Sequence, residues 1–172
     1  KENKELIPKT IKHIFIISDR RERIETLRKI AKAVNSDKTM IFINTKYDLE
    51  ESLQKLQYHN YNVAALAGNI DKQSKKKAVE DFQNGRLQYL LATDVAARGL
   101  QIDHVSTVIN VNLPEEPTEY LHRAGRCGRN NEQGLCISII TENELNKIKK
   151  YQKAFNINIV QKRLYNGKIV SK

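Results

Sequence analysis

The chain has 172 residues, 40% of them hydrophobic and 29% charged, which predicts one globular domain with a full core and is short for two. No apolar run reaches the roughly 18 residues needed to cross a bilayer, so no membrane contact is expected. Two cysteines, Cys127 and Cys136, are too few for a disulfide framework and favour a reducing, cytoplasmic compartment, while the formal charge of +10 favours a polyanionic partner.

Strand-like and helix-like patterns alternate along the chain. Short β-branched apolar runs predict strands over residues 11–18, 39–44, 63–68, 89–93, 105–111 and 134–140. Apolar residues at helical spacing predict helices over residues 21–34, 46–60, 73–84, 117–124 and 142–154. Most of the strands are apolar on both faces, as in parallel sheets that helices cover. The sequence therefore predicts an α/β domain with a mainly parallel central sheet between two helical layers.

Several element boundaries have chemical reasons. Gly85 is expected to end the third helix in a left-handed conformation, and Pro117 fits the first turn of the fourth. Thr141 and Glu144 have the spacing of a capping box for the last helix. A further strand is expected over residues 156–162.

An arginine-rich segment reads Tyr-Leu-His-Arg-Ala-Gly-Arg-Cys-Gly-Arg from Tyr120 to Arg129. On a helix, the spacing of Arg123, Arg126 and Arg129 would align their guanidinium groups along one edge. The glycines between them would let a bulky charged partner approach the backbone. Because planar guanidinium forks suit phosphoryl oxygens, a phosphate-binding role is favoured over the alternative of a solvated basic face.

A second segment follows the predicted strand at residues 89–93. It reads Ala-Thr-Asp-Val-Ala-Ala-Arg-Gly-Leu-Gln over residues 92–101. Asp94 is expected to cap a single helical turn that Gly99 ends, and Thr93 with the exposed amides of that turn would form a phosphate cradle. The alternative is a capped short helix with no ligand.

The C-terminal end, residues 145–172, is strongly basic and has no acidic residue. Tyr151, Phe155 and Tyr165 lie among its lysines. Basic residues interleaved with aromatic ones are typical of nucleic-acid binding. They are equally typical of an amphipathic helix followed by a strand, with the aromatic residues in the core. Both interpretations stay open from the sequence alone.

Three segments together resemble the DEAD-box family of ATP-dependent RNA helicases. Ile41-Phe-Ile-Asn-Thr45 resembles motif IV of the family, residues 92–101 resemble motif V, and residues 122–129 resemble motif VI, in the family's order and spacing. The sequence contains no Gly-Lys-Ser/Thr loop and no Asp-Glu-Ala-Asp run, which in the family belong to the first RecA-like domain. The resemblance therefore implies the second RecA-like domain, a three-layer sandwich over residues 11–172, preceded by a linker remnant over residues 1–10.

The resemblance also implies roles for individual residues. Arg126 and Arg129 match arginine fingers that reach the γ-phosphate of ATP, and Gln101 stands where the family usually has the aspartate that binds the ribose. Interdomain coupling is implied for Asp94, His122 and Arg123, and RNA binding for Thr45, Lys72, Lys75, Thr93 and Gly99. Lys72 and Lys75 replace a Gln-x-x-Arg pair, and Asn112 replaces a usual acid, so these contacts are expected to differ from those of the family.

The implied function is that of half an ATP-dependent RNA helicase, which couples ATP binding and hydrolysis to local unwinding of an RNA duplex. Its partners would be RNA and the N-terminal RecA-like domain of the same protein, and its cofactors ATP and Mg²⁺, with the Mg²⁺ ligands in that other domain. The domain on its own is expected to be inactive. The alternatives are a non-catalytic RNA-binding module and a protein-interaction module with a RecA-like fold.

Overall fold

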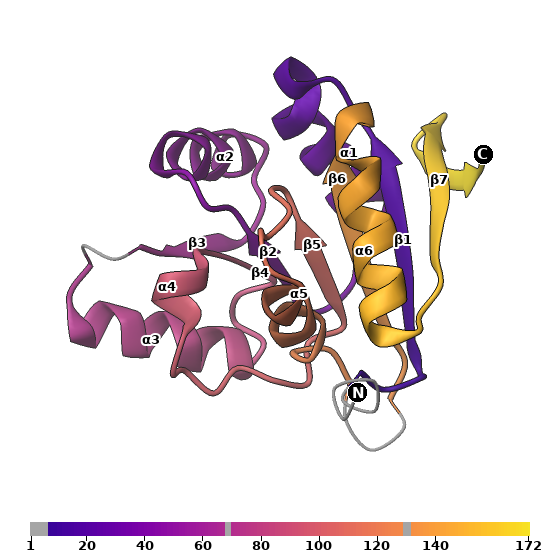
Figure 1. The fold of residues 1–172 in the computed structure, drawn as a ribbon. Coiled ribbons are helices and arrows are strands. Elements are labelled where there is room, and N and C mark those ends of the chain that lie inside the picture. Colours follow the sequence, from indigo (N-terminus) through magenta and orange to yellow (C-terminus); the bar gives the residue numbers. More distant parts are fainter. Residues whose placement is uncertain (1–6, 68–69, 129–131) are drawn as a thin grey trace.

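The computed structural model describes residues 7–67, 70–128 and 132–172. Within these ranges, one sheet of eight strands runs through the molecule in the order β3-β4-β2-β5-β6-β1-β7-β8 (Figure 1). The strands are β1 (Ile11–Ile17), β2 (Thr39–Phe42), β3 (Val63–Leu66), β4 (Tyr89–Ala92), β5 (Thr107–Asn110), β6 (Gly134–Ile140), β7 (Ile159–Tyr165) and β8 (Lys168–Ser171). Every pairing is parallel except that of β7 with β8, which confirms the predicted mainly parallel sheet.

Helices cover both faces of this sheet (Figure 1). They are α1 (Arg23–Val34), α2 (Lys46–Tyr58), α3 (Lys72–Gln83), α4 (Asp94–Ala97), α5 (Pro117–Ala124) and α6 (Leu145–Phe155), with 3-10 turns at Arg20–Glu22 and Glu142–Glu144. No helix in the described ranges combines the length and the apolar character that a bilayer span requires.

Two hydrophobic cores separate the three layers. One core joins α1 and α2 to the sheet, through residues such as Leu27 and Leu56, and the other joins α3, α4, α5 and α6 to the opposite face. All four residues of β2, β4 and β5 are buried, which explains why these strands are apolar on both faces. Each fully buried Leu or Ile contributes about 1.5–3 kcal/mol, so the two cores dominate the stability.

The helix boundaries largely follow the predicted chemistry. Gly85 has a φ of 84° just after α3, and Pro117 occupies the first turn of α5. The Thr141 N–H donates to the Glu144 carboxylate at 2.9 Å, as in the predicted capping box. The cap of α4 was assigned wrongly: the Thr93 hydroxyl accepts the Ala96 N–H, whereas the Asp94 side chain turns elsewhere.

The C-terminal end differs from the prediction. The expected strand over residues 156–162 begins three residues later, and a second strand, β8, returns antiparallel to it. Asn166 and Gly167 connect the two strands, with φ values of 51° and 75°. Positive φ at both positions is the signature of a tight hairpin turn, and the Asn-Gly pair was the sequence signal that predicts it.

The aromatic residues of α6 belong to the core. Tyr151 and Phe155 are buried, and the Tyr151 hydroxyl donates to the carbonyl oxygen of Pro114. Tyr151 also stacks on Tyr120 with ring centroids 4.8 Å apart. For the helical part of residues 145–172, this supports the amphipathic-helix interpretation. Tyr165 of β7 is 58% exposed and is not explained by it.

A buried histidine of β1 lies beneath α6. His13 is 5% exposed, and its Nδ1 shares a hydrogen bond of 2.8 Å with the Tyr120 hydroxyl. Its Nε2 has no hydrogen-bond partner within the described ranges. Burial lowers the pKa of His13 from 6.5 to about 4. Between these values the unfolded chain binds a proton that the folded chain does not bind, so stability falls as the pH is lowered through this window.

We therefore expect His13 to make the free energy of unfolding about 2 kcal/mol lower at pH 5 than at pH 7. Urea unfolding at both pH values checks this. The difference between the two pH values should shrink by about that amount in His13→Asn, whatever the absolute stability of the variant. His59→Asn, at an exposed position, is the control. An undiminished difference in His13→Asn would contradict the assignment.

Candidate functional site

Polar side chains gather where the central strands end. Asn44 follows β2, Asp94 follows β4 and Asn112 follows β5, and these three strands are neighbours in the sheet. The Asn44 N–H donates to the Asn112 side-chain oxygen at 2.9 Å, and the Asp94 N–H lies 3.4 Å from the Asn44 side-chain oxygen. These bonds hold the three loops together at the carboxyl edge, where ligands of open α/β sheets collect.

The Arg123 side chain of α5 forms hydrogen bonds to two of the same loops, those that follow β4 and β5. Its Nε and Nη2 donate to the two Asp94 carboxylate oxygens at 2.8 and 2.6 Å. Its Nη1 donates to the Asn110 side-chain oxygen at 3.1 Å and to the Asn112 carbonyl oxygen at 2.6 Å. The guanidinium carbon lies 5.0 Å from the centroid of the Phe42 ring, and the residue is only 1% exposed. A buried guanidinium with this many partners fixes the geometry of the edge.

The pKa of Asp94 reflects this pairing. Burial alone raises it, but the hydrogen bonds and charge of Arg123 outweigh burial and hold the pKa below its ordinary value. Asp94 is therefore a carboxylate at neutral pH. Arg123 and Asp94 thus pair with each other inside this domain, and the interdomain role implied for them stays a prediction.

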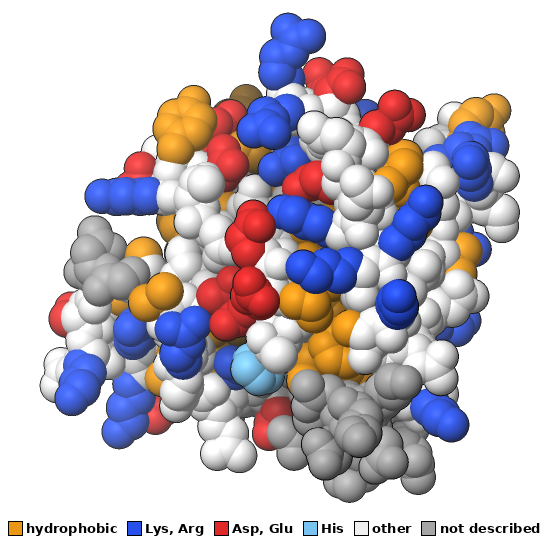
Figure 2. Space-filling model, in the orientation of Figure 1, with side chains coloured by type: hydrophobic (Ala, Val, Ile, Leu, Met, Phe, Trp, Pro, Cys, Tyr) orange, Lys and Arg blue, Asp and Glu red, His pale blue; other side chains and the backbone are white. Residues whose placement is uncertain are grey.

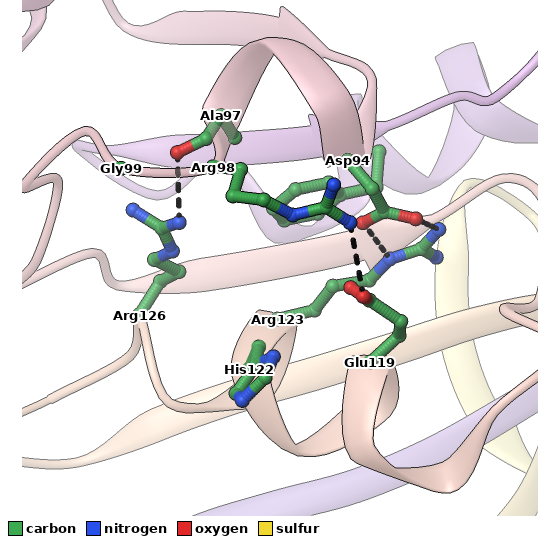
Figure 3. A pocket seen from close by; sticks show the side chains of 9 residues that line it. Asp94, Ala97, Arg98, Gly99, Glu119, His122, Arg123 and Arg126 are labelled. Carbon is green, nitrogen blue, oxygen red and sulfur yellow. Dashed lines mark hydrogen bonds and ion pairs between the residues drawn. The ribbon is translucent and has the colours of Figure 1, made fainter.

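Arg126 lies in the turn that follows α5, half-buried against the segment after α4. Its Nη1 donates to the Leu100 carbonyl oxygen at 2.7 Å and lies 3.4 Å from that of Ile102, and its Nη2 donates to the Ala97 carbonyl oxygen at 3.1 Å (Figure 3). Burial lowers the pKa of Arg126, and the charges of Asp103 and Asp94 oppose this effect. Among the described residues, the hydrogen-bond acceptors of this guanidinium are three carbonyl oxygens.

The predicted alignment of the arginines along one helical edge is wrong. Helix α5 ends at Ala124, so Arg123 points into the sheet edge while Arg126 lies beyond the helix. Packing within the domain also explains the glycine at position 128, because a Cβ atom there would lie 2.7 Å from the Glu132 carbonyl oxygen. Arg129 lies outside the described residues.

Two hollows meet at Arg126. One, of about 200 Å³, is lined by Phe42, Asp94, Ala97, Arg98, Gly99, Glu119, His122, Arg123 and Arg126 (Figure 3). The other, of about 400 Å³, is lined by Leu100, Gln101, Ile102, Asp103, Leu121, His122, Gly125 and Arg126. His122 is exposed and lies on the wall between them, and Arg98 pairs with Glu119 at 3.3 Å across the first. Gln101, His122 and Arg126 thus line the same hollow, and their predicted roles in ATP binding and interdomain coupling stay predictions.

The residues predicted to bind RNA lie along the same edge. Thr45 caps α2 by accepting the Asp48 N–H, and Thr93 caps α4, so both hydroxyls keep their hydrogen free to donate to another acceptor. Gly99, with a φ of 81°, turns the chain after α4. Lys72 and Lys75 lie on the first turn of α3, which starts at this edge because it follows β3.

Three further residues support the site, and the sequence assigned none of them an individual role, although Phe42 and Asn44 lie in the motif IV segment. Phe42, Asn44 and Asn110 position Asp94 and Arg123 but carry no reactive group of their own. The sequence could have indicated Asn110, because a side-chain amide in an otherwise apolar strand needs a buried hydrogen-bond partner. Among the described residues, no three His, Cys, Asp or Glu side chains gather as metal ligands.

Comparison with known proteins defines the class. Residues 22–131 match the family described as the helicase conserved C-terminal domain, and because this stretch is more than half of the chain, the chain belongs to that family. The DEAD-box ATP-dependent RNA helicase CshC of Bacillus cereus is 34% identical over 160 residues, which are 93% of this chain and 41% of that protein.

Solved structures agree with this assignment. The C-terminal domain of the DEAD-box protein Dbp5 is 29% identical, with 90% of this chain and 91% of that chain covered and a TM-score of 0.84. The structure of S. cerevisiae Dbp5 bound to RNA and ADP BeF3 is 28% identical, with 94% of this chain and 44% of that chain covered and a TM-score of 0.85. The chain spans about two fifths of the length of the curated relatives it matches, and it corresponds to the C-terminal RecA-like domain of DEAD-box helicases.

The internal ion pair gives a test of this site. Asp94→Ala should lower the free energy of unfolding by about 3–5 kcal/mol, because it leaves the Arg123 guanidinium buried without its counter-charge. The matched control is Glu119→Ala, which removes the partner of the 65% exposed Arg98 side chain and should cost less than about 1 kcal/mol. Urea unfolding of both variants measures the two losses. Equal losses would mean that the buried pair does not hold the edge together.

Proposed function

We propose that this domain supplies one wall of the ATP site and part of the RNA track of an ATP-dependent RNA helicase. The observation that carries the proposal is the placement of Arg126, whose guanidinium stands between two hollows at the carboxyl edge of the sheet. A planar, permanently charged fork at an open edge suits a phosphate that a second domain presents. The expected second domain is the N-terminal RecA-like domain, which would also hold Mg²⁺.

The role of Arg126 in this proposal is electrostatic. Two of its N–H groups, on Nε and on Nη2, have no hydrogen-bond partner among the described residues, so they remain free for phosphoryl oxygens. Stabilisation of the charge that develops during phosphoryl transfer is worth about 10³ to 10⁵ in rate. Arg129 is proposed for the same role from its place in the motif, and Gln101 as an acceptor for the ribose hydroxyls.

We propose that Arg123 acts as a positioning residue. It holds Asp94, and Asp94 begins the turn whose last residue, Ala97, accepts a hydrogen bond from Arg126 Nη2 at its carbonyl oxygen. Exposed His122 is the better candidate for direct contact with the other domain.

The RNA track is proposed to follow Thr45, Thr93 and Gly99 toward Lys72 and Lys75. The hydroxyls would donate to phosphate oxygens and the lysines would add charge, so the contacts set register without reading bases. Closure of the two domains on ATP and RNA would hold one strand in a path that separates it from its complement. We propose a cytoplasmic location, consistent with two buried, unpaired cysteines.

The complete protein that contains this domain provides the test. Arg126→Ala should lower the ATP turnover rate at saturating RNA by about 10³ or more, because the lost fork acts on the transition state. RNA affinity without nucleotide should change less than about twofold, because Arg126 is not one of the residues proposed to contact RNA. Turnover of radiolabelled ATP and fluorescence anisotropy measure the two quantities.

The matched control is Arg86→Ala, whose side chain is 70% exposed and lies away from the cleft. It should leave turnover unchanged. Arg126→Lys should restore only part of the rate, since it keeps a charge but loses the fork. Normal turnover in Arg126→Ala would remove this residue from the catalytic role.

A further inference from the structure

Most of the positive charge excess lies at one end of the chain. Residues 145–172 hold 8 Lys and Arg side chains and no acid, whereas residues 1–144 hold 22 basic and 20 acidic side chains. The net charge of +10 is therefore +8 from this end and +2 from the rest. Because a local concentration of charge attracts polyanions, the surface formed by α6, β7 and β8 should attract one.

One face of the β7–β8 ribbon continues the sheet face that α6 covers. Ile159 of β7 packs in the same core as the aromatic residues of α6. Since side chains alternate along a strand, Arg163 and Tyr165 point to that same face. The antiparallel register places Lys168 opposite Tyr165 and therefore on this face too. The Arg163 guanidinium carbon lies 5.2 Å from the centroid of the Tyr165 ring.

The neighbouring flank of α6 adds two lysines. The Gln152 side-chain oxygen accepts the Ile159 N–H at 2.8 Å, so this flank of α6 faces β7. Lys149 lies three residues before Gln152 and Lys153 four residues after Lys149, which puts both on that flank. Lys and Arg side chains gather over α6 and β7 in Figure 2. We call the set of Lys149, Lys153, Arg163, Tyr165 and Lys168 the ribbon surface.

The cations of the ribbon surface are uncompensated. Lys147 of α6 pairs with Glu115 at 3.0 Å, but within the described ranges none of the four ribbon cations forms an ion pair. Lysines alone would protect an edge strand from aggregation. That purpose does not explain an exposed tyrosine stacked with an arginine, because an exposed aromatic ring adds apolar surface to the edge.

We propose that the ribbon surface is a second binding site for single-stranded RNA, separate from the ATP and RNA contacts proposed at the carboxyl edge of the sheet. The cations would contact phosphates, and the Tyr165 ring would stack with an unpaired base, a combination that binds single strands with little sequence preference. Strands β5, β6 and β1 separate β7 from β2, which places this surface roughly 20 Å from the cleft at the usual strand spacing. The site goes beyond the proposed function, since it requires neither ATP nor a second domain.

The test compares two variants of equal charge change. Lys149→Gln/Lys153→Gln/Arg163→Gln removes three ribbon cations, and Arg21→Gln/Lys29→Gln/Lys32→Gln removes three exposed cations before and along α1. Binding of the 172-residue chain to a fluorescent oligoadenylate of about twelve nucleotides is followed by anisotropy between about 50 and 200 mM salt. The ribbon variant should lose about tenfold in affinity and its salt slope should fall by about 2, whereas the α1 variant should lose less than about twofold.

Stacking has its own pair of variants. Tyr165→Ala should weaken binding by about tenfold, and Tyr58→Ala, which removes a ring that is 82% exposed at the end of α2, should not weaken it. Circular dichroism confirms that each variant is folded. Full affinity in Tyr165→Ala would overturn the proposal, as would equal losses in the ribbon and α1 variants.

Two further measurements separate this site from other interpretations. The ribbon losses should persist when Lys72→Gln/Lys75→Gln is also present, because that pair belongs to the cleft track. If the ribbon substitutions caused no loss of affinity in the Lys72→Gln/Lys75→Gln variant, the ribbon surface would not be a separate site. Polyglutamate should displace the RNA far less well than unlabelled RNA of equal charge. Equal displacement would mean a surface for acidic proteins and would overturn the RNA assignment.

Discussion

The buried pair of Arg123 and Asp94 is the interaction on which the functional edge depends. Burying a guanidinium that is 1% exposed would be strongly destabilising without acceptors, and this one has both oxygens of a carboxylate, an amide oxygen and a carbonyl oxygen. These acceptors come from the ends of two different strands. Satisfying one buried cation therefore fixes the relative positions of the loops that follow β4 and β5.

The same constraint links the two halves of the site. Helix α4 is a single turn with three different sets of contacts. Asp94 accepts from Arg123, the Thr93 hydroxyl just before the turn accepts the Ala96 N–H, and the Ala97 carbonyl oxygen accepts from Arg126. A displacement of Arg126 toward a phosphate would break its bonds to this segment, and a displacement of the turn by RNA would move the Arg126 acceptors. Thr93 and Ala97 are four residues apart, so coupling between the proposed RNA and nucleotide contacts would need only this one turn.

The sequence predicted what local patterns and spacing determine. Alternating patterns were enough for the layered parallel fold, and Pro117 and Gly85 marked helix boundaries correctly. The errors have a common cause, because the orientation of a polar side chain depends on partners remote in the chain. Asp94 lies 29 residues from Arg123, so its capping role was plausible locally and wrong in three dimensions. The hairpin at Asn166 was a different error, a local signal that was overlooked.

Burial explains why cations at the two ends of the sheet behave differently. At the carboxyl edge of the sheet, Arg123 is buried and Arg126 is half-buried, so desolvation favours acceptors for them within the protein. The four cations of the ribbon surface are exposed, and water solvates them at no cost to the fold. Because the ribbon cations form no ion pair within the described ranges, their charge remains available to attract an external polyanion. Different cations therefore serve the two purposes. Arg123 and Arg126 fix the geometry of the carboxyl edge, whereas the exposed cations of the ribbon surface can attract a polyanion.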